Sequence, residues 1–254
     1  MTRLRRTVAM AALALTVSAS AAAAAGSAAE GLFAEGNGLY RKGEFAAARQ
    51  RYLAAAETGV RDARLFYNLG NACFKDGRLG EAVVWYERAL RLDPRDEDAR
   101  ANLQFARRVK RDQEPEDAGG LGSALYALYL WPTLNELVLA VTLCLVAGFA
   151  AASWRIVRGG GAACVALLVL CAGGAAAAGG WTATRVHRHV LLQEAVLTVD
   201  EGTARSGPGA RETPVFVVHE GTKVTVERRE GDWLLVRLGN GLGGWLPVSA
   251  VTAI

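Results

Sequence analysis

Apolar and polar residues follow three different patterns along the chain. Between residues 30 and 111, apolar residues recur at every third or fourth position, which is typical of helices with one buried face. Residues 134–154 and 162–181 are almost entirely apolar and are long enough to span a bilayer. Residues 195–254 contain short runs that alternate with period two between Gly- and Asn-containing turns, which indicates strands. We therefore expect a multidomain chain with a helical domain, two membrane helices and a β domain.

The helical part contains an internal repeat with a period of 34 residues. Six positions recur in the same order, where Gly36, Gly43, Phe45, Ala48, Tyr52 and Ala55 correspond to Gly70, Gly77, Leu79, Ala82, Tyr86 and Ala89. A 34-residue period, with small residues where two helices touch and Gly at the turn between them, resembles the tetratricopeptide repeat (TPR). The resemblance implies an all-α TPR solenoid over residues 30–111. We expect helices at 30–42, 44–57, 64–76 and 79–92, with a capping helix at 96–110.

The first helix of each repeat lines the concave face of such a solenoid, so its residues there are candidates for contacting a ligand. They are Phe33, Asn37, Tyr40, Arg41, Tyr67, Asn71, Phe74 and Lys75. The two asparagines are equivalent in the repeat, and an amide can both donate to and accept from an extended peptide backbone. The two cations are also equivalent and would favour an acidic segment. Alternatively, the asparagines and aromatics serve packing and hydrogen bonds between repeats.

The two apolar stretches predict a transmembrane helical hairpin, with helices at 134–154 and 162–181. Only residues 155–161 separate them, so the link is a tight turn. It contains Arg155 and Arg158, and the positive-inside rule therefore assigns this turn to the cytoplasm. The domains before and after the hairpin are then both expected on the opposite side.

The N-terminal segment predicts export. Residues 1–29 have a basic start, an apolar run and then small residues, which is typical of a signal peptide. Residues 112–133 are expected to form a linker between the repeats and the hairpin. The sequence thus predicts a protein of the bacterial inner membrane, in contact with the lipid bilayer, with its TPR and β domains on the periplasmic side.

Several short motifs of the C-terminal domain resemble a bacterial SH3-like (SH3b) domain. They lie at residues 204–208, 219–224, 231–233 and 244–247. The resemblance implies an all-β SH3-like barrel over residues 195–254, and we expect Trp233 and Trp245 to supply much of its small core. A ligand groove for peptidoglycan stem peptides would be lined by Arg205, Ser206, Gly207, Pro208 and Trp245. Alternatively, the Ser-Gly-Pro stretch simply forms a turn.

The order of segments, from signal peptide through TPR repeats and two membrane helices to an SH3b domain, resembles the BatE proteins of the Bacteroides aerotolerance (Bat) operon. That resemblance implies a membrane-anchored periplasmic scaffold for protein–protein interaction, within a Bat-type envelope complex linked to stress or aerotolerance. It also implies partners, namely membrane proteins with von Willebrand factor A domains. The alternative function is binding of cell-wall peptidoglycan through the SH3b domain.

Charge and motif content exclude other classes of function. The formal charge is +4, but three of the 29 basic residues lie in the first six positions, which leaves 26 basic against 25 acidic side chains and no footprint for nucleic acid. We find no hydrolase, phosphate-binding or zinc motif, and Cys73 has no evident base in the sequence. His187 and His189 lack a third metal ligand. We therefore expect no catalytic residues, no metal and no cofactor.

Overall fold

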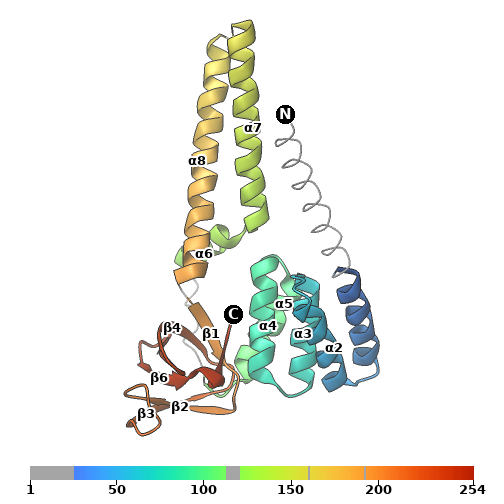
Figure 1. Ribbon diagram of the computed structural model, residues 1–254, viewed down its shortest axis with the longest axis vertical. Helices are drawn as coiled ribbons and strands as arrows, with labels where there is room; N and C mark the ends of the chain where they lie inside the picture. The colour runs from blue at the N-terminus through green and yellow to red at the C-terminus, as the bar shows by residue number, and fades with distance from the viewer. Residues whose placement is uncertain (1–25, 113–120, 160, 192) are drawn as a thin grey trace, which may run out of the picture.

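The computed structural model describes residues 26–112, 121–159, 161–191 and 193–254. A helical domain lies beside a β domain, and a long helical hairpin extends away from them with its turn at the far end (Figure 1). Both domains therefore lie at the same end of the hairpin, which is the arrangement that so short a turn imposes.

Five helices form the N-terminal domain. Their bounds are 26–41 for the first helix, Phe45–Glu57 for α2, Ala63–Lys75 for α3, Leu79–Leu92 for α4 and Glu97–Val109 for α5. Helix α4 has the predicted bounds, and α2, α3 and α5 begin and end within one residue of theirs. The predicted all-α solenoid of two helix pairs and a capping helix is thus confirmed.

Two aspartates fix the starts of α3 and α5. The side chain of Asp62 accepts a hydrogen bond from the backbone N–H of Arg64, and that of Asp96 accepts one from Ala99. Each satisfies a donor that the first turn of a helix leaves unpaired.

The repeated Gly and Tyr positions form the contact between the two helices of each pair. A Cβ atom at Gly36 would come within 2.6 Å of the Tyr52 ring, and one at Gly70 within 2.6 Å of the Tyr86 ring. Both rings are buried in the core of the domain. The glycines are therefore required because a tyrosine ring packs directly on the backbone of the partner helix.

The predicted signal peptide, residues 1–29, falls outside the described residues up to position 25. Residues 26–29 belong to the first helix, and Ala29 is buried in the repeat core. Cleavage after residue 29 would remove this side chain from the core, so the signal-peptide boundary stays a prediction.

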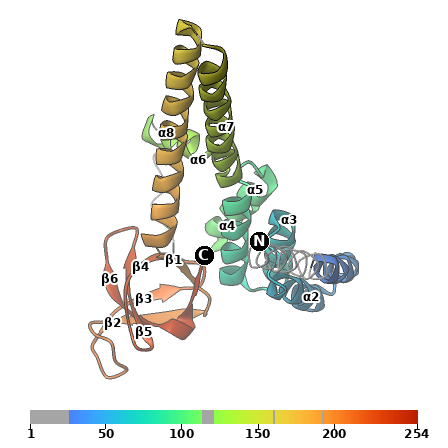
Figure 2. The same ribbon diagram turned by 45° about the horizontal axis from the view of Figure 1, so that its top comes forward.

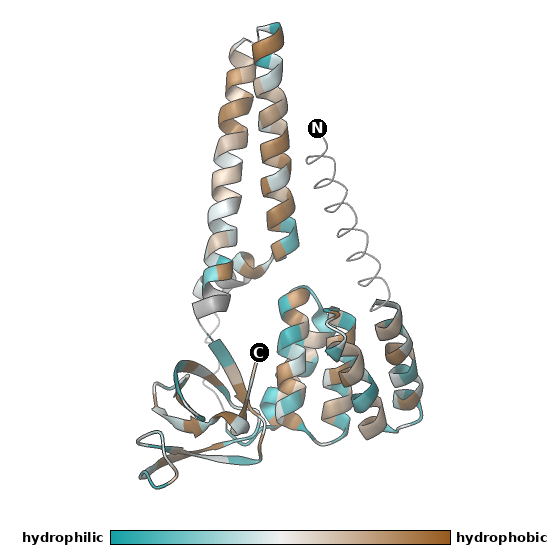
Figure 3. Ribbon diagram, viewed as in Figure 1, coloured by the Kyte–Doolittle hydropathy of each residue, from teal (hydrophilic) through white to brown (hydrophobic). Residues whose placement is uncertain are grey.

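The hairpin consists of α7, Leu134–Arg158, and α8, Ala162–Leu191. Both helices are strongly apolar over at least 18 residues, and very little of these stretches is buried against the rest of the protein. Such exposure is unlike that of the core helix of a soluble protein. Hydrophobic residues recur along both helices of the hairpin (Figure 3). Both helices are long and apolar enough to cross a membrane.

Two predicted boundaries around the hairpin change. The turn expected at 155–161 is shorter, because α7 continues to Arg158 and ends at Gly159, whose φ of 69° suits a helix C-terminus. Helix α8 continues ten residues beyond the predicted end at Trp181. In addition, the region expected as a linker, 112–133, contains the ten-residue helix α6, Leu121–Leu130, whose Tyr129 accepts hydrogen bonds from Trp181 and Arg185 of α8.

Seven strands form one antiparallel sheet in the order β3-β2-β6-β5-β4-β1-β7. Their bounds are Gln193–Leu197 for β1, Glu201–Arg205 for β2, Pro214–His219 for β3, Lys223–Glu230 for β4, Trp233–Leu238 for β5, Gly243–Pro247 for β6 and Val251–Ala253 for β7. The all-β domain is confirmed. A short 3-10 turn, Val248–Ala250, joins the last two strands.

The core of the β domain differs from the prediction. It is formed mainly by small and aliphatic residues, with Leu234, Val236 and Leu246 among them, and Trp233 is not part of it. Trp233 precedes the inward-facing Leu234, so the period of two turns its ring to the outer face, where it is half-buried. Trp245 is buried, but beneath Arg228, whose guanidinium lies 5.0 Å from the ring centroid.

Candidate functional site

The side chain of Asn37 is held inside the repeat array. Its carboxamide oxygen accepts a hydrogen bond from the Tyr52 hydroxyl at 2.8 Å and another from the Asn68 amide at 3.1 Å. Burial raises the pKa of Tyr52 to about 12, so this hydroxyl remains a donor at physiological pH. Asn37 thereby joins both helices of the first pair to the first helix of the second.

Asn71 makes the equivalent contacts one repeat later. Its oxygen accepts from the Tyr86 hydroxyl at 2.7 Å and from the Asn102 amide of the capping helix at 2.8 Å. Burial also raises the pKa of Tyr86. The two asparagines thus make the inter-repeat hydrogen bonds that were the alternative to ligand contact, and their oxygens already have two donors each.

The four predicted groove aromatics are half-buried and paired with other rings. The centroid distances are 5.8 Å for Phe33–Tyr52, 5.2 Å for Tyr40–Phe45, 6.2 Å for Tyr67–Tyr86 and 5.6 Å for Phe74–Phe105. Pairs at such distances stabilise packing beyond the area that they bury. Partial burial raises the pKa of Tyr40, and the neighbouring Tyr67 adds to it. Their exposed parts leave an aromatic surface on the first-helix side of the repeats.

The structure adds Phe105 to this surface. Its side chain is 53% exposed on α5 and packs edge-on against Phe74. Phe105 lies 34 residues after Asn71, so the 34-residue period places it at the equivalent groove position of the capping helix. Arg41 and Lys75 are exposed, as a contact to an acidic ligand would require.

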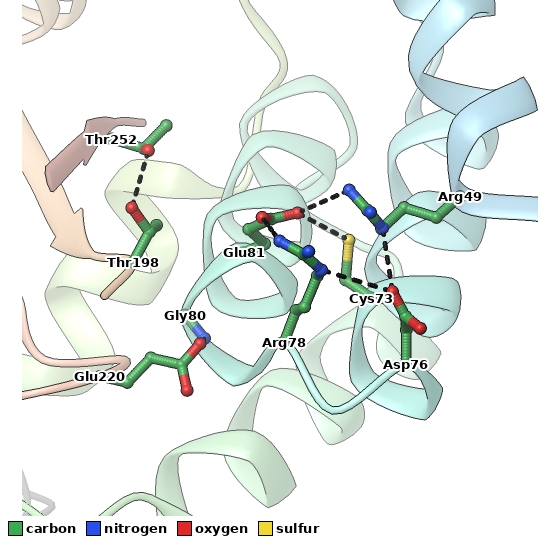
Figure 4. A network of polar contacts seen from close by, with 9 residues as sticks. All are labelled: Arg49, Cys73, Asp76, Arg78, Gly80, Glu81, Thr198, Glu220 and Thr252. Carbon is green, nitrogen blue, oxygen red and sulfur yellow. Dashed lines mark hydrogen bonds and ion pairs between the residues drawn. The ribbon is translucent and has the colours of Figure 1, made fainter. Parts of the chain in front are cut away.

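A polar network joins α2 to the turn between α3 and α4 (Figure 4). Arg49 contacts the carboxylates of Asp76 at 3.1 Å and Glu81 at 3.4 Å, and Arg78 contacts the same two at 3.4 and 2.8 Å. The Cys73 thiol lies 3.7 Å from Glu81, a neighbour that the sequence did not reveal. Burial, with the charge of Glu81, raises the pKa of this thiol, so it remains an unreactive packing group.

The same end of α4 abuts the β domain. The backbone N–H of Gly80 donates to the Glu220 carboxylate at 2.7 Å (Figure 4). A Cβ atom at Gly80 would collide with the backbone oxygen of Leu197 and come within 3.0 Å of Thr198 Cα. The strand backbone therefore approaches the helix as closely as a glycine allows.

Asp112, just after α5, ties the repeats to the β domain through three hydrogen bonds. Its carboxylate accepts from the backbone N–H of His219 at 2.7 Å and the Thr222 hydroxyl at 3.0 Å, and it meets His219 Nδ1 at 2.7 Å. Partial burial alone would raise the pKa of Asp112, but these hydrogen bonds outweigh it and the pKa is lowered.

A chain of charged groups continues this interface. Glu194 of β1 contacts Arg91 of α4 at 3.1 Å and Lys223 of β4 at 3.0 Å, and the two cations outweigh burial and lower its pKa. Val196 of β1 is buried in the core of the repeats, and Ile254 packs against that core. Figure 2 shows residue 254 between the sheet and α4. The two domains therefore form one docked unit.

The predicted SH3b groove separates into two parts. Strand pairing places Arg205 opposite Trp245. The stretch Ser206-Gly207-Pro208 instead folds back, with the Ser206 N–H donating to the Thr213 carbonyl at 3.0 Å and its hydroxyl near Glu212 at 3.4 Å. These contacts are those of a turn, the alternative given by the sequence.

The repeats also contact the base of the hairpin. Arg95, in the turn before α5, pairs with Glu136 of α7 at 2.8 Å and lies over the Trp131 ring at 5.2 Å. Tyr129 of α6 stacks on Trp181 of α8, with centroids 6.0 Å apart. The docked unit is thereby held against one end of the two apolar helices.

Comparison with known families identifies both domains. Residues 33–97 match the tetratricopeptide repeat, and residues 200–252 match the bacterial SH3 domain. The chain joins a TPR domain to a bacterial SH3 domain. It is also 38% identical over 53 residues to the putative N-acetylmuramoyl-L-alanine amidase YrvJ of Bacillus subtilis (strain 168). That stretch is 21% of this chain, and the match spans a tenth of the relative's length.

The described residues contain no group of three His, Cys, Asp or Glu side chains that could hold a metal ion. The four cysteines are unpaired. TPR and SH3 domains are binding domains without catalytic residues of their own, so the site to consider is a surface that recognises a partner.

Proposed function

We propose that this chain is a membrane-anchored scaffold that binds a polypeptide partner on the first-helix face of its TPR domain. The observation that carries the proposal is the exposed Phe105 beside Phe74, which is large aromatic surface without a cover in the described chain. Aromatic anchors of this kind dominate the affinity of many interfaces. Arg41 and Lys75 would favour a segment that carries acidic residues.

The docked SH3 domain gives this scaffold a defined geometry. Because the repeats contact both the SH3 domain and the base of the hairpin, a partner on the repeat surface would be held at a fixed position relative to the membrane. We place both domains in the periplasm and the hairpin in the inner membrane, supported by the arginines beside the far turn. The order of segments supports a Bat-type complex, with von Willebrand factor A-domain membrane proteins as partners.

A cross-linking pull-down tests the scaffold function. The tagged full-length protein is cross-linked in its native membranes, and the captured proteins are identified by mass spectrometry. Phe105→Ser should reduce the capture of the partner at least about fivefold, because truncating an interface aromatic costs on the order of 1–2 kcal/mol. Leu242→Ser is the matched control, since Leu242 is 50% exposed on the SH3 domain. Equal capture by both variants would remove this surface from the function.

A second candidate function is binding of peptidoglycan by the SH3 domain. It is supported by the similarity to a protein that is named as an N-acetylmuramoyl-L-alanine amidase, and by the placement of Arg205 beside Trp245. Full-length protein in detergent would be sedimented with purified sacculi. Retention that falls with Arg205→Ala but not with Phe105→Ser would support this function, whereas the absence of retention would exclude it.

A further inference from the structure

A cavity of about 760 Å³ lies where the repeats, the last strand and the base of the hairpin meet. The repeats contribute residues around the turn between α2 and α3 and along the outer face of α4. The hairpin contributes Thr133, Leu134 and Asn135 from the start of α7, and Arg185 and Val186 from α8. The cavity thus adjoins the end of the two apolar helices at which the polar domains begin.

The cavity is strongly positive. Four arginines line it, namely Arg61, Arg88, Arg91 and Arg185, and no aspartate or glutamate does. Arg91 pairs with Glu194 at 3.1 Å, whereas the other three form no ion pair within the described residues. Within the described residues, three of the four arginines that line the cavity therefore have no carboxylate side chain paired with them.

Two of the arginines that lack a carboxylate, Arg88 and Arg185, are oriented by neutral groups. Arg88 donates to the Ala253 carbonyl at 2.6 Å and stacks 4.5 Å over the Trp85 ring. Arg185 is only 5% exposed and donates to the carbonyls of Tyr129 and Pro132 at 3.2 and 3.1 Å. A guanidinium has five N–H donors, so these contacts fix each group and leave donors for an anion. Burial, and then the positive charges of the neighbouring Arg91 and Arg61, lower the pKa of Arg88.

An apolar groove continues from this cavity along the hairpin. It has a volume of about 380 Å³ and lies between α7, with Val138 and Val141, and α8, with Gly179 and Ala183. The small residues on α8 leave the space that a larger side chain would fill. Val186 lines both the groove and the cavity, so the two are adjacent.

We propose that the cavity binds the phosphate headgroup of an anionic phospholipid, with one acyl chain in the groove between α7 and α8. Arginine suits a phosphate because its planar guanidinium donates two parallel hydrogen bonds. A soluble phosphate would use the cations but not the apolar groove. An acidic peptide segment would not bind in the apolar groove between α7 and α8, because burying its charges there is unfavourable. The inference rests on the placement of the hairpin in a bilayer and not on the identity of any protein partner.

Native mass spectrometry of the full-length protein, extracted in mild detergent, tests the proposal. The delipidated protein is titrated with phosphatidylglycerol or with phosphatidylcholine, and the occupancy of bound lipid is compared. Phosphatidylglycerol should be retained at least about tenfold more strongly. Arg61→Gln should lower that preference several-fold, because it removes one of the positive charges that line the cavity at an exposed side chain. In the double variant Arg61→Gln with Arg88→Gln, the retention of phosphatidylglycerol should fall close to that of phosphatidylcholine.

Arg64→Gln is the matched control, because Arg64 is an exposed arginine nearby that pairs with Asp62 and does not line the cavity. Gly179→Leu fills the groove and should weaken lipid retention while leaving the cations unchanged. Equal retention of the two lipids, or an equal effect of Arg61→Gln and Arg64→Gln, would overturn the proposal. Displacement of the lipid by an equal concentration of soluble glycerol phosphate would overturn the assignment to a lipid.

Discussion

A buried hydroxyl that loses its hydrogen-bond acceptor costs free energy, because no water replaces the acceptor. Tyr86 is in this position, since its hydroxyl donates to Asn71 and its ring is buried in the repeat core. Asn71 therefore acts on the stability of the repeats whether or not it also meets a ligand. The same argument holds for Asn37 and Tyr52.

We predict that Asn71→Ala lowers the free energy of unfolding by about 1–3 kcal/mol, because it leaves the buried hydroxyl of Tyr86 without an acceptor and removes the shorter of the two hydrogen bonds that the Asn102 amide donates. Urea unfolding of the purified protein in mild detergent measures the loss. In the double variant Asn71→Ala with Tyr86→Phe, both ends of one hydrogen bond are removed, so the total loss should be smaller than the sum of the single losses. Unchanged stability with weaker partner capture would instead identify Asn71 as a ligand contact.

For single side chains, the sequence predicted on which helix a residue lies better than it predicted which groups the residue contacts. The 34-residue period identified Asn37 and Asn71 as equivalent and placed them on the first helices of their repeats. Whether their amides face a ligand or a neighbouring helix depends on partners in other elements. Asn102, for example, lies 31 residues after Asn71 in the chain. The Trp233 prediction was wrong because large aromatic rings do not have to lie in the core when the register of the strand turns them outward.

Helices and strands, by contrast, were well predicted, because their ends depend on local chemistry. The caps at Asp62 and Asp96 and the glycine turns set the helix bounds within the repeats. Helix α6 was missed because its ten apolar and small residues follow a polar stretch, and its place depends on Trp181 and Arg185 of α8. An element that is stabilised mainly by distant contacts leaves little local signal.

Gly80 lies in α4, and its substitution gives a prediction whose sign depends on the docking of the two domains. In an isolated helix, Gly→Ala stabilises by about 1 kcal/mol. At Gly80 the added Cβ would instead collide with the Leu197 carbonyl oxygen and approach Glu220 Cγ to 2.9 Å. We expect Gly80→Ala to separate the unfolding of the repeats from that of the SH3 domain, so that one thermal transition becomes two.

Gly31→Ala is the matched control for this change. Gly31 lies in the first helix, and nothing lies within 4 Å of the Cβ that alanine would add. This variant should raise the thermal midpoint and keep a single transition. If Gly80→Ala behaved in the same way, the close approach of α4 and the strand backbone would not be important for docking.

The relation between the domains is what the sequence could not provide. The short turn of the hairpin predicted that both domains lie at the same end, but not that they touch. The residues that join them are far apart in the chain, since Asp112 and His219 differ by 107 in residue number and Gly80 and Glu220 by 140. No local pattern identifies such pairs, and each side chain alone resembles an ordinary surface residue.

The docked arrangement should weaken in acid because two of its carboxylates, those of Asp112 and Glu194, have lowered pKa values. A group whose pKa is lower in the folded state contributes stability above its unfolded pKa, and that stability is lost as the pH falls through the folded value. The ordinary values are 3.8 for Asp112 and 4.5 for Glu194, so the loss should begin near these values and increase below them. Glu220 has the opposite effect on the pH dependence of stability. Burial raises its pKa, so its contribution to stability is lost as the pH rises.

We therefore predict that the thermal midpoint of the docked unit falls steeply between about pH 5 and pH 3, because the two carboxylates with lowered pKa values outweigh Glu220 at this interface. Asp112→Asn should lower the midpoint at neutral pH and make its pH dependence shallower, since the hydrogen bonds from His219 and Thr222 then meet a neutral acceptor. Asp232→Asn, at an exposed turn of the SH3 domain, should leave the slope unchanged. If the slopes of both variants equalled that of the unmodified protein, the acid sensitivity would have to arise from other carboxylates, and Asp112 would not be the group that joins the two domains.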